Sequence, residues 1–243
     1  MSLPIFYIPP EHFDGDAATL TGDELRHARL TLRLGPGDRA LVVDGEGTLC
    51  EGTFSSMEKA QGVLQITSRT REAEPAFSLT IAMGIVAGER FDWALQKGTE
   101  LGASAFIPLL SRRTEVKASR PWKRLERLRR VVVSACKQCG RARFPTLSEP
   151  VALHDLSTAG YDLALAFWES DRAAPLSEAA GRVQRPASCL MIIGPVGGFA
   201  PEEAEILREK GCLLAGLGPR ILRTETAVTA GAALVQYLWG DMG

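Results

Sequence analysis

Residues 190–203 read LMIIGPVGGFAPEE, and they decide the fold class of this chain. The apolar run 190–193 is typical of a buried strand. Pro201 and the acidic pair after it are typical of the first turn of a helix, where proline fits and the helix dipole favours negative charge. A strand, a glycine turn and a helix in this order predict a βα unit of a parallel sheet. Ala200 is a poor N-cap, so the turn is not built mainly for local stability.

The glycines of this turn indicate contact with a ligand. Gly194, Gly197 and Gly198 have no Cβ, so a ligand can approach the backbone N–H and C=O groups directly. Their spacing, G-x-x-G-G, differs from the dinucleotide and P-loop patterns G-x-G-x-x-G and G-x-x-x-x-G-K-[ST]. Taken alone, the turn is also compatible with a tight structural connection.

A second turn strengthens the ligand interpretation. Residues 213–227 read LLAGLGPRILRTETA and again lead from a strand through Gly218 and Pro219 into a helix. Ligands of parallel sheets bind at the carboxyl ends of the strands, so we expect both turns to border one site. Arg223 and Glu225 either serve that site or form a structural ion pair.

The rest of the chain divides into two patterns. Residues 1–72 predict a small β-barrel with a short helix over 21–29, in which Thr21 and Glu24 form a capping box. Residues 77–243 predict an α/β domain whose parallel sheet is covered on both faces. The expected strands of the barrel are 40–43, 49–54 and 62–67. The expected strands of the α/β domain are 77–83, 105–110, 161–167, 190–193 and 213–217, and its expected helices are 90–101, 122–139, 201–210 and 224–239.

Positive charge is concentrated in one segment of a chain whose net charge is only −1. Residues 112–143 hold twelve Lys or Arg and two Asp or Glu, a local charge of +10, whereas residues 1–72 carry −4. Such an asymmetry favours a polyanionic partner such as RNA over a merely solvated helix face, which usually intersperses acidic residues. We predict RNA contact by Arg33, Arg112, Arg113, Lys137, Gln138 and Arg141.

Composition excludes several other classes. The chain of 243 residues is 45% hydrophobic, and no apolar run reaches the roughly 18 residues of a membrane span. The first residues do not resemble a secretory signal, so a cytoplasmic protein is expected. Five cysteines, an odd number with only Cys136 and Cys139 close together, argue against a disulfide framework. A metal site is not expected, since zinc needs about four ligands.

Five motifs, in order, resemble one family. The two glycine turns look like those of the SPOUT-class RNA methyltransferases, and within them the RsmE type, which methylates N3 of a uridine in 16S ribosomal RNA. Residues 27–45, HARLTLRLGPGDRALVVDG, resemble that family's PUA-like barrel. KGTELG at 97–102 and CKQCGR at 136–141 resemble its middle motifs. The resemblance extends over nearly the whole chain.

The resemblance implies a C-terminal SPOUT domain with a trefoil knot, S-adenosylmethionine as the methyl donor, the small ribosomal subunit as partner, and a homodimer. It also implies a cofactor pocket formed by the two turns, consistent with the main-chain groups and the apolar slot that they offer. The cofactor-binding residues that it implies are Gly194, Gly197, Gly198, Leu217, Gly218, Ile221, Leu222 and Thr224.

Methylation at N3 requires that a weakly acidic N–H lose its proton or that the resulting anion be stabilised. No histidine falls within a motif near the predicted sheet edge, which argues against an imidazole base. We therefore predict Arg223 as the stabiliser of the uracil anion and Glu225 as the orienting group or proton acceptor.

Two positions depart from the family pattern. The family turn usually reads Gly-Pro-Glu-Gly-Gly, and Val196 occupies the Glu position here. The middle motif usually begins Glu-Gln, and Lys137 precedes Gln138 here. Because Val196 replaces the usual glutamate, an impaired enzyme or a non-catalytic RNA-binding protein is an alternative function. A methyltransferase acting on another RNA and a nucleotide-binding enzyme on a doubly wound sheet are further alternatives.

Overall fold

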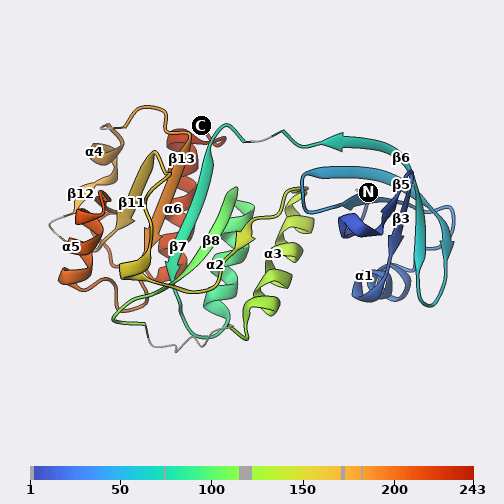
Figure 1. Cartoon of the computed structure of the whole chain (residues 1–243), viewed down its shortest axis with the longest axis horizontal. Coiled ribbons are helices and arrows are strands. Elements are labelled where there is room, and N and C mark those ends of the chain that lie inside the picture. Colours follow the sequence, from blue (N-terminus) through green and yellow to red (C-terminus); the bar gives the residue numbers. More distant parts are fainter. Residues whose placement is uncertain (1–2, 74, 115–121, 171–172, 182) are drawn as a thin grey trace. The chain divides into compact units, whose positions relative to one another are not determined.

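The computed structural model describes residues 3–73, 75–114, 122–170, 173–181 and 183–243, and the chain forms two compact units (Figure 1). The first unit comprises Met1–Glu74 and Val133–Phe144. The second unit comprises Pro75–Val132 and Pro145–Gly243. The first unit therefore contains a segment from the middle of the chain in addition to the N-terminal residues.

The first unit is built around a six-stranded sheet with the order β1-β4-β5-β6-β3-β2. Its pairings are antiparallel except for β1 with β4. Phe6 on edge strand β1 and Phe13 on edge strand β2 pack in the same hydrophobic core as Phe54, so the sheet curls around one core. The strands are β1 (Ile5–Tyr7), β2 (Phe13–Asp14), β3 (Ala17–Leu20), β4 (Arg39–Val43), β5 (Thr48–Met57) and β6 (Gly62–Arg71).

The helix expected over 21–29 is divided. Helix α1 spans Gly22–Arg26 and is followed by a π-helical turn, His27–Thr31. Thr21 is the N-cap residue but makes no side-chain capping bond, so the predicted capping box is wrong. The reason is competition, because the Glu24 carboxylate pairs with Lys137 and accepts a hydrogen bond from the Tyr7 N–H at 3.4 Å.

The second unit contains a parallel sheet with the order β10-β8-β7-β13-β11-β14-β12, and β9 also pairs with β8. Every pairing in it is parallel, as predicted from the βα pattern. The strands are β7 (Ser78–Gly84), β8 (Ala103–Leu110), β9 (Thr146–Leu147), β10 (Val151–Ala152), β11 (Leu163–Phe167), β12 (Ala174–Pro175), β13 (Ser188–Ile193) and β14 (Leu213–Gly216). The two-residue strands β9, β10 and β12 have no expected counterpart because they are too short to show periodicity.

Four of the helices after α1 agree with the apolar patterns to within a few residues, whereas the short helix α4 (Leu176–Gly181) was not predicted. The four are α2 (Glu89–Glu100), α3 (Leu125–Cys139), α5 (Pro201–Glu209) and α6 (Thr224–Trp239), and the 3-10 turns are Pro10–His12 and Leu153–Asp155. Helix α3 begins at Leu125 rather than at Trp122. The N–H of Trp122 donates to Glu149, and its ring packs edge-on against Phe91, so Trp122 serves as an anchor ahead of the helix.

Helices cover both faces of the parallel sheet, as predicted. On one face, Leu190 and Ile192 of β13 form a core with Ala204 and Leu207 of α5. On the other face α6 packs closely, because a Cβ on Gly231 would stand 2.8 Å from the ring of Phe167 and 3.0 Å from the sulfur of Met191. This glycine permits the close approach of helix to sheet that places the start of α6 beside the strand ends.

The described helices include none with the length and apolar character that crossing a membrane would require.

Candidate functional site

A pocket lies where β11, β13 and β14 end. These three strands are parallel neighbours, so their carboxyl ends lie at one edge of the sheet, where ligands of such folds bind. We call this cavity the edge pocket. It is lined by Phe167, Trp168, Glu169, Ile193, Gly194, Pro195, Val196, Gly198, Leu217, Gly218, Arg220, Ile221, Leu222, Thr224 and Ala227.

In the first glycine turn, the backbone of Gly194 and Pro195 lies directly against the end of β7. A Cβ on Gly84, the last residue of β7, would overlap the backbone of Gly194 and Pro195. Gly198 has φ +66°, a conformation that favours glycine, and its N–H donates to the carbonyl of Pro195 at 2.8 Å. Gly84 was not singled out in the sequence, because nothing local distinguishes it from an ordinary strand end.

The two turns predicted to hold a cofactor do border one pocket. Of the residues implied for that role, all except Gly197 line it. The hydroxyl of Thr224 donates to the carbonyl of Gly194 at 3.1 Å, so it ties the second turn to the first. A Cβ on Gly218, which has φ +94°, would meet no atom within 4 Å. The site thus offers open space beside bare backbone, as a ligand requires.

Gly197 instead faces the loop that follows β8. Its carbonyl accepts a hydrogen bond from the Arg113 guanidinium at 2.5 Å, and a Cβ on Gly197 would stand 3.1 Å from the Arg113 stem. The Glu203 carboxylate joins the same two segments, because it accepts from the N–H of Arg112 at 2.7 Å and from the N–H of Ala200 at 2.9 Å. Glu203 therefore supplies the cap that the Ala200 side chain lacks.

Two apolar side chains of the edge pocket are exposed to solvent. The side chains of Val196 and Ile221 are 52% and 84% exposed. A wider groove borders the pocket along the exposed side of α6, and Trp168, Glu169, Leu217, Gly218, Arg220 and Ile221 line both. We call it the neighbouring groove; its further lining residues include Pro175, Leu176, Leu234, Tyr237 and Leu238.

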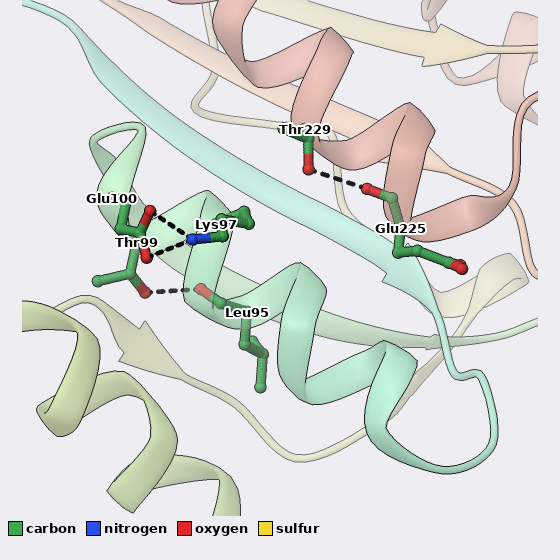
Figure 2. Close-up of polar contacts among 6 residues, drawn as sticks. All are labelled: Leu95, Lys97, Thr99, Glu100, Glu225 and Thr229. Carbon is green, nitrogen blue, oxygen red and sulfur yellow. Dashed lines mark hydrogen bonds and ion pairs between the residues drawn. The ribbon is translucent and has the colours of Figure 1, made fainter.

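Arg223 and Glu225 flank the edge pocket without lining it. Arg223 is the N-cap residue of α6 and is exposed, whereas Glu225 lies in the first turn and is half-buried. In the described part of the chain, no ion pair joins these two residues, and Oε2 of Glu225 is buried without a hydrogen-bond partner. Figure 2 shows Thr229 bonded to the Glu225 carbonyl, with the carboxylate directed away from the Lys97–Glu100 pair on α2.

Two pocket residues come from a segment that sequence reasoning missed. Trp168 and Glu169 follow β11, and the indole N–H of Trp168 donates to the carbonyl of Phe199 at 3.3 Å. The Glu169 carboxylate lies against Gly198, where a Cβ would overlap it. The available signal was the position of these residues directly after a predicted strand, at the same sheet edge as both glycine turns.

The residues predicted to contact RNA differ in their surroundings. Arg33 is exposed and has φ +57°, a conformation that is uncommon for residues other than glycine. Gln138 is exposed, whereas Lys137 is half-buried and paired with Glu24. Arg112 forms an exposed ion pair with Glu202. Arg141 is half-buried.

Other basic residues of the segment 112–143 are also paired, Arg124 and Arg127 with Asp92 and Arg129 with Glu126. Residues 115–121 of this segment lie outside the described residues. The charge that the described residues offer to a partner is therefore smaller than the sequence count suggests.

Cys136 is buried and Cys139, three residues later on the same helix, is exposed. The Sγ of Cys139 lies 3.7 Å from the carbonyl of Cys136, and burial raises the pKa of the Cys136 thiol to about 12. A buried thiol of this kind is inert. Across the described ranges, no cluster of three or more His, Cys, Asp or Glu side chains is arranged to hold a metal ion.

Comparison with known proteins defines the class to which this fold and pocket belong. A family model described as an RNA methyltransferase domain matches residues 72–236, and one described as an RNA methyltransferase PUA domain matches residues 20–67. The PUA match falls on the curled sheet of the first unit. The methyltransferase match covers the whole parallel sheet and both glycine turns. The chain thus joins a PUA domain to an RNA methyltransferase domain.

Relatives and solved structures specify the family further. The chain is 32% identical to ribosomal RNA small subunit methyltransferase E of Bacillus subtilis over 230 residues, 90% of this chain and 89% of the relative. A Neisseria gonorrhoeae structure of that name, bound to S-adenosyl methionine, is 32% identical with a TM-score of 0.88 over 100% of both chains. A putative methyltransferase of Legionella pneumophila, bound to the same cofactor, is 28% identical with a TM-score of 0.90, covering 99% of this chain and 100% of that one. The chain belongs to the ribosomal RNA small subunit methyltransferase E family.

The tie between the two turns yields a test of stability. Thr224→Val removes the donor to Gly194 and leaves a buried carbonyl unpaired, so the free energy of unfolding should fall by about 1–3 kcal/mol. Thr229→Val is the matched control, because its hydroxyl donates to the Glu225 carbonyl, which the regular helix bond also occupies. Thermal unfolding of both variants measures the difference. Equal Tm values for the two variants would show that the tie contributes nothing.

Proposed function

We propose that this protein transfers a methyl group from S-adenosylmethionine to N3 of a uridine in 16S ribosomal RNA of the small subunit. The observation that carries the proposal is the edge pocket, in which both glycine turns of the family meet at one sheet edge. Its family membership and the two similar structures with bound cofactor support the same activity.

The pocket residues fit this cofactor. S-adenosylmethionine supplies, when bound, a methyl group on a sulfonium that a nucleophile can take. Leu217, Leu222 and Ile193 offer an apolar slot for the uncharged adenine, and the open side of Gly218 leaves backbone within reach of polar atoms. The proposed binding residues remain Gly194, Gly197, Gly198, Leu217, Gly218, Ile221, Leu222 and Thr224, with Gly197 acting through the shape of the turn.

Arg223 and Glu225 are the proposed catalytic residues. Uracil N3 carries a proton that must leave before or during its attack on the methyl group. The unpartnered Oε2 of Glu225 is an acceptor without a donor, which suits a group that takes or orients that proton. The exposed Arg223, two residues earlier, is suited to stabilise the negative charge on the base.

RNA contact is proposed for an exposed patch of the first unit and for basic residues beyond it. Arg33 lies beside Leu30 and Leu32, whose side chains are 68% and 40% exposed, so a cation and apolar surface occur together. Nucleic-acid sites combine these two features, because cations bind phosphates and apolar groups contact bases. Arg112, Arg113, Lys137, Gln138 and Arg141 complete the proposed set.

A homodimer is also proposed. Leu234, Tyr237 and Leu238 lie on one face of α6 and are 42%, 64% and 38% exposed. An apolar face of this kind marks an interaction surface. Light scattering distinguishes a dimer from a monomer.

Three further properties are proposed because the family resemblance or the nature of the substrate implies them. The first is a trefoil knot in the SPOUT domain. The second is the division into a PUA-like domain, 1–72, and a SPOUT domain, 77–243, although Val133–Phe144 of the latter belongs to the first compact unit. The third is a cytoplasmic location, where the ribosomal RNA substrate is found.

Two alternative functions are a protein of this fold that binds RNA without activity, suggested by Val196, and a methyltransferase that acts on another RNA.

A transfer assay with labelled S-adenosylmethionine and undermethylated small subunits tests the proposal. The wild type should label the subunit at a uridine N3. Gly198→Val should bind no cofactor, because a side chain there overlaps Glu169 and strains the turn. A wild type that binds cofactor but labels no RNA would favour the inactive alternative, and label at another site the second.

The catalytic assignment predicts a specific kinetic effect. Glu225→Gln and Arg223→Ala should each lower kcat on the order of 100-fold or more while cofactor affinity stays near that of the wild type. Glu209→Gln, an exposed glutamate at the end of α5, is the control and should be unaffected. Wild-type turnover by both variants would exclude these residues as catalytic groups.

The RNA assignment predicts a change in salt dependence. Each phosphate contact contributes roughly 0.7–0.9 to the slope of log affinity against log salt, so Arg33→Ala should flatten that slope by about this amount. Arg39→Ala is the matched control, because Arg39 is an exposed arginine of the same unit that pairs with Glu51. RNA binding measured over a salt series gives both slopes. An identical slope for Arg33→Ala and the wild type would remove Arg33 from the interface.

A further inference from the structure

Two side chains of opposite charge are among the described residues that line the edge pocket. Glu169 follows β11, and Arg220 lies in the loop between β14 and α6. Among the described residues that line the edge pocket or the neighbouring groove, these are the only charged side chains. Both line both cavities, so the charges lie where the pocket opens into the groove.

Among the described residues, no side chain of opposite charge pairs with Glu169 or Arg220. The described residues include no ion pair or side-chain hydrogen bond of Glu169 or of Arg220, and the two do not pair with each other. The Glu169 carboxylate also lies against Gly198, the residue of the turn with φ +66°. A negative and a positive side chain in one pocket, without partners among the described residues, suit a ligand that carries both a positive and a negative group.

The methionine part of S-adenosylmethionine is such a ligand. Its α-ammonium and α-carboxylate sit on one carbon, and the ammonium has three N–H donors, whereas the sulfonium has none. The ammonium alone can therefore donate charged hydrogen bonds to a protein carboxylate, and a protein guanidinium can donate them to the carboxylate of the ligand. We propose that Glu169 binds the α-ammonium and Arg220 the α-carboxylate of the cofactor, an assignment that rests on the function proposed above.

This assignment also orients the ligand. The uncharged adenine takes the apolar slot beside Leu217 and Leu222, and the amino-acid end takes the charged opening toward the groove. The pocket then distinguishes cofactors that carry an amino-acid end from adenosine derivatives that lack it.

Calorimetry with three ligands tests the proposal without any need for turnover. S-adenosylmethionine and S-adenosylhomocysteine both carry the amino-acid end, and 5′-methylthioadenosine lacks it. Glu169→Gln and Arg220→Gln should each weaken the first two on the order of 10- to 100-fold, as expected for loss of a charged hydrogen bond, and leave the third unchanged. Glu209→Gln is the matched control for a change of charge outside the pocket.

The third ligand separates binding chemistry from damage to the fold. Equal loss of all three ligands, or no loss of any, would overturn the assignment. Loss of S-adenosylmethionine alone would place Glu169 at the sulfonium and also overturn it. Failure of the wild type to bind S-adenosylmethionine would contradict the proposed function itself.

Discussion

The close approach of bare backbone at the end of β7 is the constraint on which the site depends. Gly84 and the turn at Gly194 and Pro195 touch without side chains, and no other residue at position 84 leaves room for that contact. With the turn held there, Gly198 takes up its left-handed conformation and the Thr224 hydroxyl reaches Gly194. The parallel sheet brings the strand ends together, and this contact fixes where the turn that lines the pocket passes the end of β7.

The same turn connects the pocket to the basic loop after β8. Arg113 donates to Gly197, and Glu203 holds the backbone of both Arg112 and Ala200. The residues of this loop that are proposed to contact RNA therefore also hold the turn that is proposed to bind the cofactor. Substitution of Arg113 would remove the donor to Gly197 in addition to any contact with RNA, which makes Arg33 the cleaner probe of the proposed RNA contact.

Local sequence was sufficient to predict elements whose pattern extends over many residues, such as a helix or a strand followed by a glycine turn. Helix α6 begins at Thr224 and ends at Trp239 as expected, and both turns border one pocket because parallel strands end together. Prediction from local sequence failed where the conformation depends on a residue far away in the chain. Glu24 pairs with Lys137 rather than capping α1. The need for glycine at position 84 arises from its contact with the backbone of Pro195. No window of sequence contains both partners of such contacts.

The substitution at Val196 changes the charge of the site more than its shape. Its side chain is half exposed at the rim, so a family glutamate there would add a second carboxylate to the pocket opening. With valine, Glu169 is the single acid among the described lining residues. Electrostatic attraction between a pocket and a cation falls with each carboxylate removed. With Glu169 bound to the cofactor as proposed above, a cationic cofactor would therefore depend more on Glu169 than it would with a glutamate at position 196. The departure from the family pattern and the unpaired acid after β11 are therefore two parts of one electrostatic arrangement.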